Sequence, residues 1–440
     1  MKKILTVIAA IALLQTAFAQ DGSNFDKVVK DVEKAQANAE NPKKAEKPDT
    51  WIKLANSLID AYTAPFGQLR KGASRTETAL FLRGMNAVRT EEVSIMGTPC
   101  SKEVFPVVNL YYTQDGVLLI TETTKPAVPG ALDRAAKALA KAKALDLDGK
   151  KAKNIDETLK RLIEMLDGEA NNCYNLSQFG ESSKFFEKIY DISRITKDEE
   201  LDKYGVSSLF NAGIASSTAK DTLRTESLFE KCVDLGYYGN EGGVFINLYY
   251  LYSGQKRFED ARAILERGYE LDPENKDIPT LLIDAYNNLG KDPKEVMTLI
   301  EKVEALRPND PYPSFAKGNI YLKMKDYDAA LASFKKSQEI NPSYWWGFYG
   351  EATVYESKGN EILEKANVEM NDRKYEALVA EFNQCIVGQV ESLSKAFKVC
   401  EDLATKKEIA KLVKDLAFRL RAEEKYQAIY DEYKSFVDNN

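Results

Sequence analysis

The sequence contains no histidine among its 440 residues. This absence excludes catalytic triads and dyads that use an imidazole, zinc sites with histidine ligands, and the commonest general base at neutral pH. A GxxxxGK[ST] phosphate loop is missing as well, since Gly239, Gly242 and Gly243 begin an expected helix without that motif or a preceding strand. A carboxylate pair could still cleave a glycoside, but 68 acidic residues spread over helical surfaces single out no pair. The sequence therefore predicts a protein that is not an enzyme and has no cofactor.

Cysteine is scarce, and no two of the five cysteines form a CxxC pair. An odd number with this spacing argues against a disulfide framework or a zinc site. Cys173, Cys232 and Cys400 fall at apolar positions of expected helices, so we predict that they are small core residues. Cys100 is expected in a loop and is the candidate for a reactive thiol.

Long apolar runs are confined to the N-terminus. Residues 1–19 combine two lysines, an apolar run from Ile4 to Leu14, and Ala17-Phe18-Ala19 ahead of Gln20. These features are typical of a bacterial secretory signal peptide, which is too short to span a membrane. A core helix is the less favoured alternative, because nothing on it would face water. We therefore expect export to the periplasm, rather than full secretion, and no membrane span.

An excess of one charge is also missing. The formal net charge is −7, from 61 basic and 68 acidic residues whose signs are interspersed. Such a mixed surface favours solubility and argues against binding to nucleic acid or to an anionic membrane.

Two prolines 34 residues apart, Pro308 and Pro342, bracket the clearest pattern in the chain. Two segments between them carry apolar residues at helical spacing, and KDYD supplies a turn. Gly318 and Ala330 are small where the two helices would cross, and Phe334 is expected to fill the core beside them. This period and pattern resemble the tetratricopeptide repeat, a helical pair that stacks on its neighbours.

Neighbouring blocks repeat this pattern. The block 242–273 ends at Pro273, 35 residues before Pro308, and has apolar residues at the same positions. Blocks 276–308, 206–239 and 163–194 keep part of it, with an extra residue in the first and a polar Thr225 in the second. Consecutive repeats of this kind predict an all-α solenoid, an αα superhelix of stacked pairs.

The first part of the chain is expected to open this array. Residues 20–63 contain an amphipathic helix at 23–39 and then Trp51, which opens a repeat helix. The second helix of that repeat does not follow, because Pro65 and Gly67 break the pattern. Residues 64–130 therefore form an insertion.

The insertion has a different periodicity. Residues 104–125 are rich in Val, Tyr, Thr and Ile around Asp115-Gly116, which predicts a β-hairpin. Its faces are expected to carry Tyr112 with Leu119 and Tyr111 with Ile120. An isolated hairpin is marginal in water, so we expect it to pack on helices or to dock a partner through these four residues. A decoration packed on the solenoid is the favoured interpretation.

The remaining residues, 131–440, are expected to form the solenoid and its C-terminal capping helices. The whole layout is similar to exported tetratricopeptide proteins of Bacteroidota. The likeness includes a signal ending in Ala-Gln, a PDTW helix entry, a hairpin insertion ending in TKP, and a final helix around EKYQAIYDEYKSF. This resemblance implies no catalytic residues.

The resemblance also implies where a partner would bind. In tetratricopeptide arrays the first helix of each pair lines the concave face. Carrying that register over places eight residues of this chain there: Ile246, Tyr250, Tyr312, Phe315, Asn319, Lys323, Trp346 and Tyr349. Adjacent rings with an amide and a cation suit an extended peptide or a partner helix. The lysine–asparagine clamp of some relatives is not matched, since Phe315 occupies the lysine position; the alternative is that these rings only fill gaps between helices.

These features predict a non-enzymatic periplasmic scaffold or adaptor. Its partner would be an envelope protein or peptide segment, in an outer-membrane assembly, secretion or uptake complex. The alternative is a soluble receptor or carrier for a glycan or peptide fragment. That alternative requires an enclosed pocket lined by tryptophans with convergent polar groups, whereas a scaffold requires an open groove.

Overall fold

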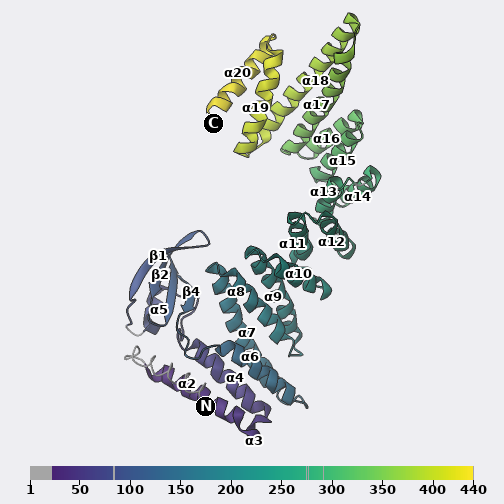
Figure 1. Ribbon diagram of the computed structural model, residues 1–440. Helices are drawn as coiled ribbons and strands as arrows, with labels where there is room; N and C mark the ends of the chain where they lie inside the picture. The colour runs from purple at the N-terminus through teal and green to yellow at the C-terminus, as the bar shows by residue number, and fades with distance from the viewer. Residues whose placement is uncertain (1–21, 83–84, 274, 276, 291, 440) are drawn as a thin grey trace. The chain divides into compact units, whose positions relative to one another are not determined.

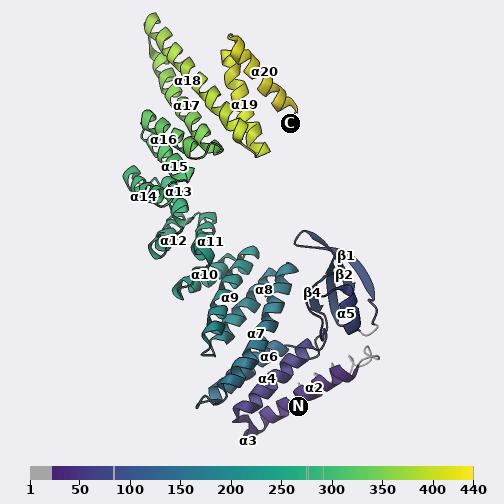
Figure 2. The ribbon, with the colours of Figure 1, turned by 180° about the vertical axis from the view of Figure 1, so that it is seen from behind.

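Helices that pair in sequence order build most of the protein (Figures 1 and 2). The computed structural model describes residues 22–82, 85–273, 275, 277–290 and 292–439. The predicted signal peptide, residues 1–19, lies outside them. The chain divides into two compact units, Met1–Gly239 and Asn240–Asn440. The predicted all-α fold with a small β-bearing insertion is confirmed.

The first unit contains paired helices and the insertion. Its helices pack as α4 with α6, α7 with α8, and α9 with α10, so the insertion separates the two members of one pair. In chain order the elements are α2 (Gly22–Glu40), α3 (Pro42–Ala45), α4 (Pro48–Thr63), α5 (Arg75–Leu82), β1 (Arg89–Ile95), β2 (Thr98–Val104), β3 (Val108–Thr113), β4 (Leu118–Thr123), α6 (Ala131–Leu145), α7 (Ala152–Asn175), α8 (Phe179–Ser193), α9 (Glu199–Thr218) and α10 (Thr222–Asp234).

The insertion forms a four-stranded antiparallel sheet in the order β1-β2-β3-β4. The predicted hairpin is β3 and β4, joined by a turn in which Gly116 has a φ of 84°. Strands β1 and β2 were not predicted. They are mostly polar, and their turn uses Met96 and Gly97, both at positive φ, instead of the Asn-Gly or Asp-Gly pair that marks such turns in a sequence.

The facing residues of the hairpin differ in part from the prediction. Tyr111 pairs with Ile120, but Tyr112 pairs with Leu118, because a register shift falls between the two tyrosines. Leu119 was expected on the same face as Tyr112, but the shift places it with Tyr111 and Ile120 instead, and the prediction was wrong. One face of the sheet packs against the segment around α5, and Asn172 of α7 donates a hydrogen bond of 3.1 Å to a β4 carbonyl. The hairpin thus packs on helices of its own unit.

The second unit continues the helical pairs. Each pair packs against the next through neighbouring helices, as expected for a solenoid. Its elements are the short 3₁₀ turn η2 (Asn240–Gly242), α11 (Gly243–Gly254), α12 (Phe258–Leu271), α13 (Ile278–Asn288), α14 (Pro293–Leu306), α15 (Pro311–Lys323), α16 (Tyr327–Ile340), α17 (Trp345–Val368), α18 (Asp372–Val399), α19 (Leu403–Leu420) and α20 (Glu424–Asn439). The charged residues 358–376 lie mostly within the end of α17 and the start of α18, so both helices of this pair are long.

One residue in the left-handed conformation turns the chain between the two helices of five successive pairs. These residues are Ser177, Lys220, Lys256, Gly290 and Lys325, with φ between 59° and 65°. This conformation costs a non-glycine residue about 1–2 kcal/mol, so the surrounding helices must impose it. The same turn occurs at Gly290 even though the block 276–308 has an extra residue. The turn therefore keeps the repeat geometry where the sequence pattern weakens.

The core of the 308–342 repeat is Phe334, which is buried as predicted. Glycines of two neighbouring helices leave room for its ring. A Cβ atom at Gly318 of α15 would lie 2.7 Å from Phe334 Cε1, and one at Gly350 of α17 would lie 2.4 Å from it. Phe334 therefore fixes the spacing between its own repeat and the next.

Adding a methyl group at Gly350 should test this packing. We expect Gly350→Ala to lower the free energy of unfolding by about 1–3 kcal/mol, because the new Cβ overlaps the Phe334 ring. The control is Gly254→Ala in α11, where a Cβ would meet no atom within 4 Å. That control should be stabilising by about 0.4–1 kcal/mol through the unfolded chain. Urea unfolding of both variants measures the contrast, and equal stabilities would contradict this packing.

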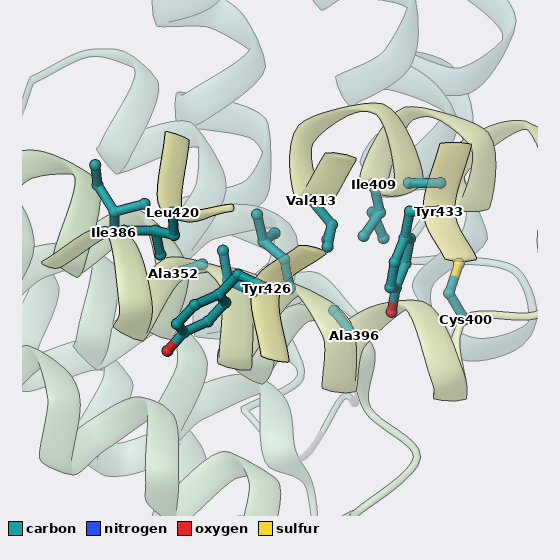
Figure 3. Close-up of a cluster of buried hydrophobic side chains, with 12 residues drawn as sticks. Ala352, Ile386, Ala396, Cys400, Ile409, Val413, Leu420, Tyr426 and Tyr433 are labelled. Atoms are coloured by element: carbon teal, nitrogen blue, oxygen red, sulfur yellow. The ribbon is translucent and has the colours of Figure 1, made fainter. Parts of the chain in front are cut away.

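The last helices of the second unit enclose a core of their own (Figure 3). Tyr426 and Tyr433 come from the EKYQAIYDEYKSF segment and are buried among aliphatic side chains of α17, α18 and α19. The expected C-terminal capping helices are α19 and α20. Tyr426 and Tyr433 thus attach the final helix to the array.

Candidate protein-binding surface

Aromatic side chains gather on α15 and at the start of α17. The centre of the group is Phe315, whose ring centroid lies 6.4 Å from Tyr312, 5.7 Å from Phe334, 5.8 Å from Tyr344 and 6.1 Å from Trp346. Such pairs contribute about 0.5–1.5 kcal/mol each beyond the area they bury. Phe315 therefore links the buried core at Phe334 to rings nearer the surface.

Two tryptophans extend this group outward. Trp345 and Trp346 stack with centroids 3.9 Å apart and ring planes 25° from parallel. Tyr349, one turn later, meets both edge-on, at 5.9 and 6.2 Å. Trp346 keeps 43% of its surface exposed in spite of these contacts. It is thus a large apolar side chain that is rigidly held and yet accessible.

Tyr312 anchors α15 to the preceding repeat. Its hydroxyl donates a 2.6 Å hydrogen bond to Oδ1 of Asp284 in α13. Burial raises the pKa of Tyr312, and the charge of Asp284 raises it further. The pKa of Asp284 is also raised by desolvation, although its side chain lies at the surface, and the bond from Tyr312 opposes that rise. Tyr312 therefore remains a neutral donor at physiological pH, and its role is to hold two repeats together.

Four of the eight residues proposed from the sequence for the concave face lie in this one cluster: Tyr312, Phe315, Trp346 and Tyr349. Asn319 and Lys323 lie about one and two turns beyond Phe315 on α15. Ile246 and Tyr250 lie apart on α11, where Tyr250 is 60% exposed and pairs with Tyr249 at 5.2 Å. We define the aromatic surface as Phe315, Tyr344, Trp345, Trp346 and Tyr349.

Sequence reasoning did not assign Tyr344 and Trp345 to this site. Tyr344 precedes the helix, so helical register could not place it, and Trp345 was not among the residues that the repeat register placed on the concave face. The signal was the run Tyr344-Trp345-Trp346 itself, since consecutive large rings at a helix start cannot all point into one core.

A small hollow adjoins the aromatic surface at Tyr349. It encloses about 170 Å³ between α17, α18 and α19, and polar side chains such as Thr353, Gln389 and Arg419 line it. Neither Trp345 nor Trp346 lines it. Pockets for small ligands usually measure about 300–1,000 Å³, so this hollow suits one side chain of a partner better than a free ligand.

The four hairpin residues proposed for docking are Tyr111, Tyr112, Leu119 and Ile120. Tyr111, Tyr112 and Ile120 are buried, and Leu119 is partly buried. The Tyr111 hydroxyl donates to Glu122 at 2.6 Å, and that of Tyr112 donates to Thr78 at 3.0 Å. These side chains are therefore engaged within the insertion.

The proposal that Cys100 is reactive needs correction. It lies in β2, not in a loop, and its side chain is fully buried. The loop was inferred only because β1 and β2 were not predicted. Cys173, Cys232 and Cys400 are buried, as expected of core residues.

All five thiols are expected to react slowly with a thiol reagent. Every cysteine is buried, and desolvation raises the pKa of Cys173 and of Cys232 to about 12, so little thiolate forms at neutral pH. With Ellman's reagent, the folded protein should show almost no fast reaction, whereas protein unfolded in guanidinium should release five equivalents. If one equivalent of thiol reacted rapidly in the folded protein, and this reaction were lost in a Cys100→Ser variant, Cys100 would be reactive as first proposed.

The described residues contain no group of three or more Cys, Asp or Glu side chains arranged to hold a metal ion. Across the same residues, no helix combines the length and the apolar character needed to cross a membrane.

Two segments of the chain match family models of the tetratricopeptide repeat. Residues 246–275 fall on α11 and α12, and residues 315–344 include most of α15 and all of α16. The matched segment 315–344 therefore includes Phe315 and Tyr344 of the aromatic surface, and the other three residues of that surface follow at the start of α17. Such repeats commonly mediate protein–protein interactions, and the fold they build is typically non-enzymatic.

Comparison with curated proteins found no match. Among solved structures, the chain is similar to MamA from Desulfovibrio magneticus RS-1, with 16% identity, 46% of this chain and 97% of that chain covered, and a TM-score of 0.32. It is also similar to YrrB, described as a TPR protein with an unusual peptide-binding site, with 19% identity, 46% of this chain and 91% of that chain covered, and a TM-score of 0.31. A third similar structure is human IFIT1 with m7Gppp-AAAA, with 17% identity, 69% of this chain and 64% of that chain covered, and a TM-score of 0.34. All three TM-scores are below 0.5, so the repeat assignment rests on the family models and on the helical pairs.

Proposed function

We propose that these tetratricopeptide repeats make the protein a non-enzymatic scaffold of the bacterial periplasm. Its aromatic surface would bind a segment of another envelope protein. Export is supported by the signal-peptide pattern of residues 1–19, and the Bacteroidota-like layout supports the cell envelope as its site of action.

The observation that carries this proposal is the exposure of Trp346 in an otherwise fixed aromatic cluster. An indole that only filled a gap between helices would be buried, yet 43% of this side chain remains exposed. Its stacking on Trp345 and its contacts with Phe315 and Tyr349 restrict its rotamer before any partner arrives. Binding would therefore lose little side-chain entropy, which is the property of a preorganised hot spot.

The chemistry of the surroundings indicates the kind of segment that would bind. The rings offer apolar faces, the hollow beside Tyr349 can take one side chain, and Asn319 and Lys323 supply an amide and a cation farther along α15. An extended segment or a short helix that presents an aromatic or aliphatic anchor fits this combination.

A receptor for a glycan or peptide fragment is the alternative function. It requires an enclosed pocket in which tryptophans converge with polar groups. Here the two tryptophans of the second unit stack on each other, and the adjoining hollow of about 170 Å³ lacks both. These observations favour the scaffold.

The test is capture of a partner from detergent-solubilised envelope by the tagged protein. Trp346→Ala removes the exposed ring, and Tyr375→Ala is the matched control, since Tyr375 is a 46% exposed aromatic residue on α18 of the same unit. We expect a stoichiometric protein partner with the wild type and with Tyr375→Ala, and its loss with Trp346→Ala. A partner that both variants retain would refute this site. Small molecules that raise the melting temperature, without any captured protein, would favour the receptor.

A further inference from the structure

A large polar groove runs between α2 and α4 in the first unit. It encloses about 1010 Å³. Helix α2 contributes residues at positions 27, 31, 34 and 38, which form one face of a helix, and α4 contributes 49, 53, 56, 60 and 63 at the same spacing. The two helices pack against each other, and α3 closes one end between them. The groove is thus built by two extended helical faces of one unit.

The groove is basic in a chain whose net charge is −7. Five lysines line it: Lys27, Lys34, Lys44, Lys47 and Lys53. The ammonium group of Lys44 donates to Asn38 at 2.8 Å, and the other four ammonium groups have no hydrogen-bond or ion-pair partner within the part of the chain that the structure describes. Four ammonium groups are therefore available along its length.

Two of the three carboxylates that line the groove form ion pairs with basic residues that do not line it. Asp49 forms a 2.8 Å ion pair with Lys151, and Asp60 forms one of 2.8 Å with Arg161 of α7. Asp31 is the remaining carboxylate in the lining. The field inside the groove is therefore positive, and it would attract an anionic ligand.

The other lining residues indicate the class of anion. Asn38, Thr50 and Ser57 offer an amide and hydroxyls that can pair with a peptide backbone, whereas the amide of Asn56 is already bonded to Ile52, Thr158 and Arg161. Among the described residues, no aromatic side chain lines the groove, so they provide none of the stacking platforms on which single-stranded nucleic acids bind. We propose that this groove binds an extended acidic peptide segment of a partner protein, at a site separate from the aromatic surface.

The length of the groove sets the size of that segment. Helix α4 has 16 residues and is about 24 Å long. An extended chain covers about 3.3 Å per residue, so about seven residues fill it. A peptide of about this length, with alternating glutamate and serine, places its carboxylates at spacings that the lysines on both helices can reach.

The test is a fluorescence-anisotropy titration of the purified full chain with that labelled peptide. The comparison probes are the same peptide with glutamine in place of glutamate, and polyphosphate of similar charge. The groove variant combines Lys34→Gln on α2 with Lys53→Gln on α4. The matched control combines Lys137→Gln with Lys141→Gln, because these lysines are exposed on α6 of the same unit and do not line the groove. Circular dichroism checks that both variants fold.

We expect the wild type to bind the glutamate peptide about tenfold or more tightly than the glutamine peptide at about 50 mM salt, where exposed charges are weakly screened. The groove variant should bind it about tenfold more weakly, and the control should change less than about twofold. Equal binding of the two peptides, or an unchanged groove variant, would overturn the proposal. Binding of polyphosphate but not of the peptide would also overturn it. A result that overturns this proposal would not bear on binding at the aromatic surface, because the two sites share no residue.

Discussion

Replacing Phe334 with alanine is expected to lower the free energy of unfolding of the second unit by about 3–5 kcal/mol. The ring is fully buried, and it fits against Gly318 and Gly350 on two neighbouring helices. Alanine would leave a cavity that those helices cannot fill, because their backbones already meet the ring and glycine offers no side chain to move inward. Phe315, which packs on Phe334 at 5.7 Å, would lose its support as well.

Urea unfolding followed by tryptophan fluorescence measures this loss. Trp345 and Trp346 belong to the second unit and Trp51 to the first, so a Trp51→Phe background makes the signal specific. Phe334→Leu is the matched control, since it keeps most of the volume and should cost less than about 1.5 kcal/mol. A loss below about 1 kcal/mol for Phe334→Ala would contradict the role of this ring.

Replacing Trp346 with alanine is expected to weaken binding of the protein partner about thirtyfold or more. A hot-spot residue contributes at least about 2 kcal/mol, and Trp346 combines the features of one: a large exposed ring fixed by its neighbours. Isothermal titration calorimetry with the captured partner measures the change. Trp346→Phe should recover part of the affinity, because a smaller ring can occupy the same position.

Two comparisons separate this effect from a loss of folding. Tyr375→Ala removes a similarly exposed ring from the same unit and should leave the affinity within about twofold. Circular dichroism and urea unfolding of Trp346→Ala should show a folded second unit. If both alanine variants bind as tightly as the wild type, Trp346 is not part of the interface.

The repeat pattern predicted the features that recur with the repeat. Phe334 and Gly318 were placed in the core because their positions follow from the spacing of a helical pair, and both are buried. The polar Thr225, unusual for its position, is also buried, and its hydroxyl donates to the Asp221 carbonyl at 2.7 Å. That bond satisfies the polar group within its own helix, so the packing tolerates the departure.

Features that depend on contacts between distant segments could not be read from the sequence. The pairing of α4 with α6 spans the whole insertion, and strands β1 and β2 lack both a strong turn signal and an apolar alternation. The bond from Tyr312 to Asp284 joins two repeats, and no local spacing predicts it. The sequence likewise showed the lysines of α2 and α4 only as separate charged residues, since the groove forms only when the two helices pack together.

Photo-crosslinking from position 346 tests the central proposal most directly. p-Benzoylphenylalanine would be placed at Trp346 and, in a separate protein, at Tyr375, and cells producing each would be irradiated. If the aromatic surface binds a protein of the envelope, position 346 should yield one discrete crosslinked protein that position 375 does not. The same product from both positions, or a product from 375 alone, would contradict a binding role for this surface.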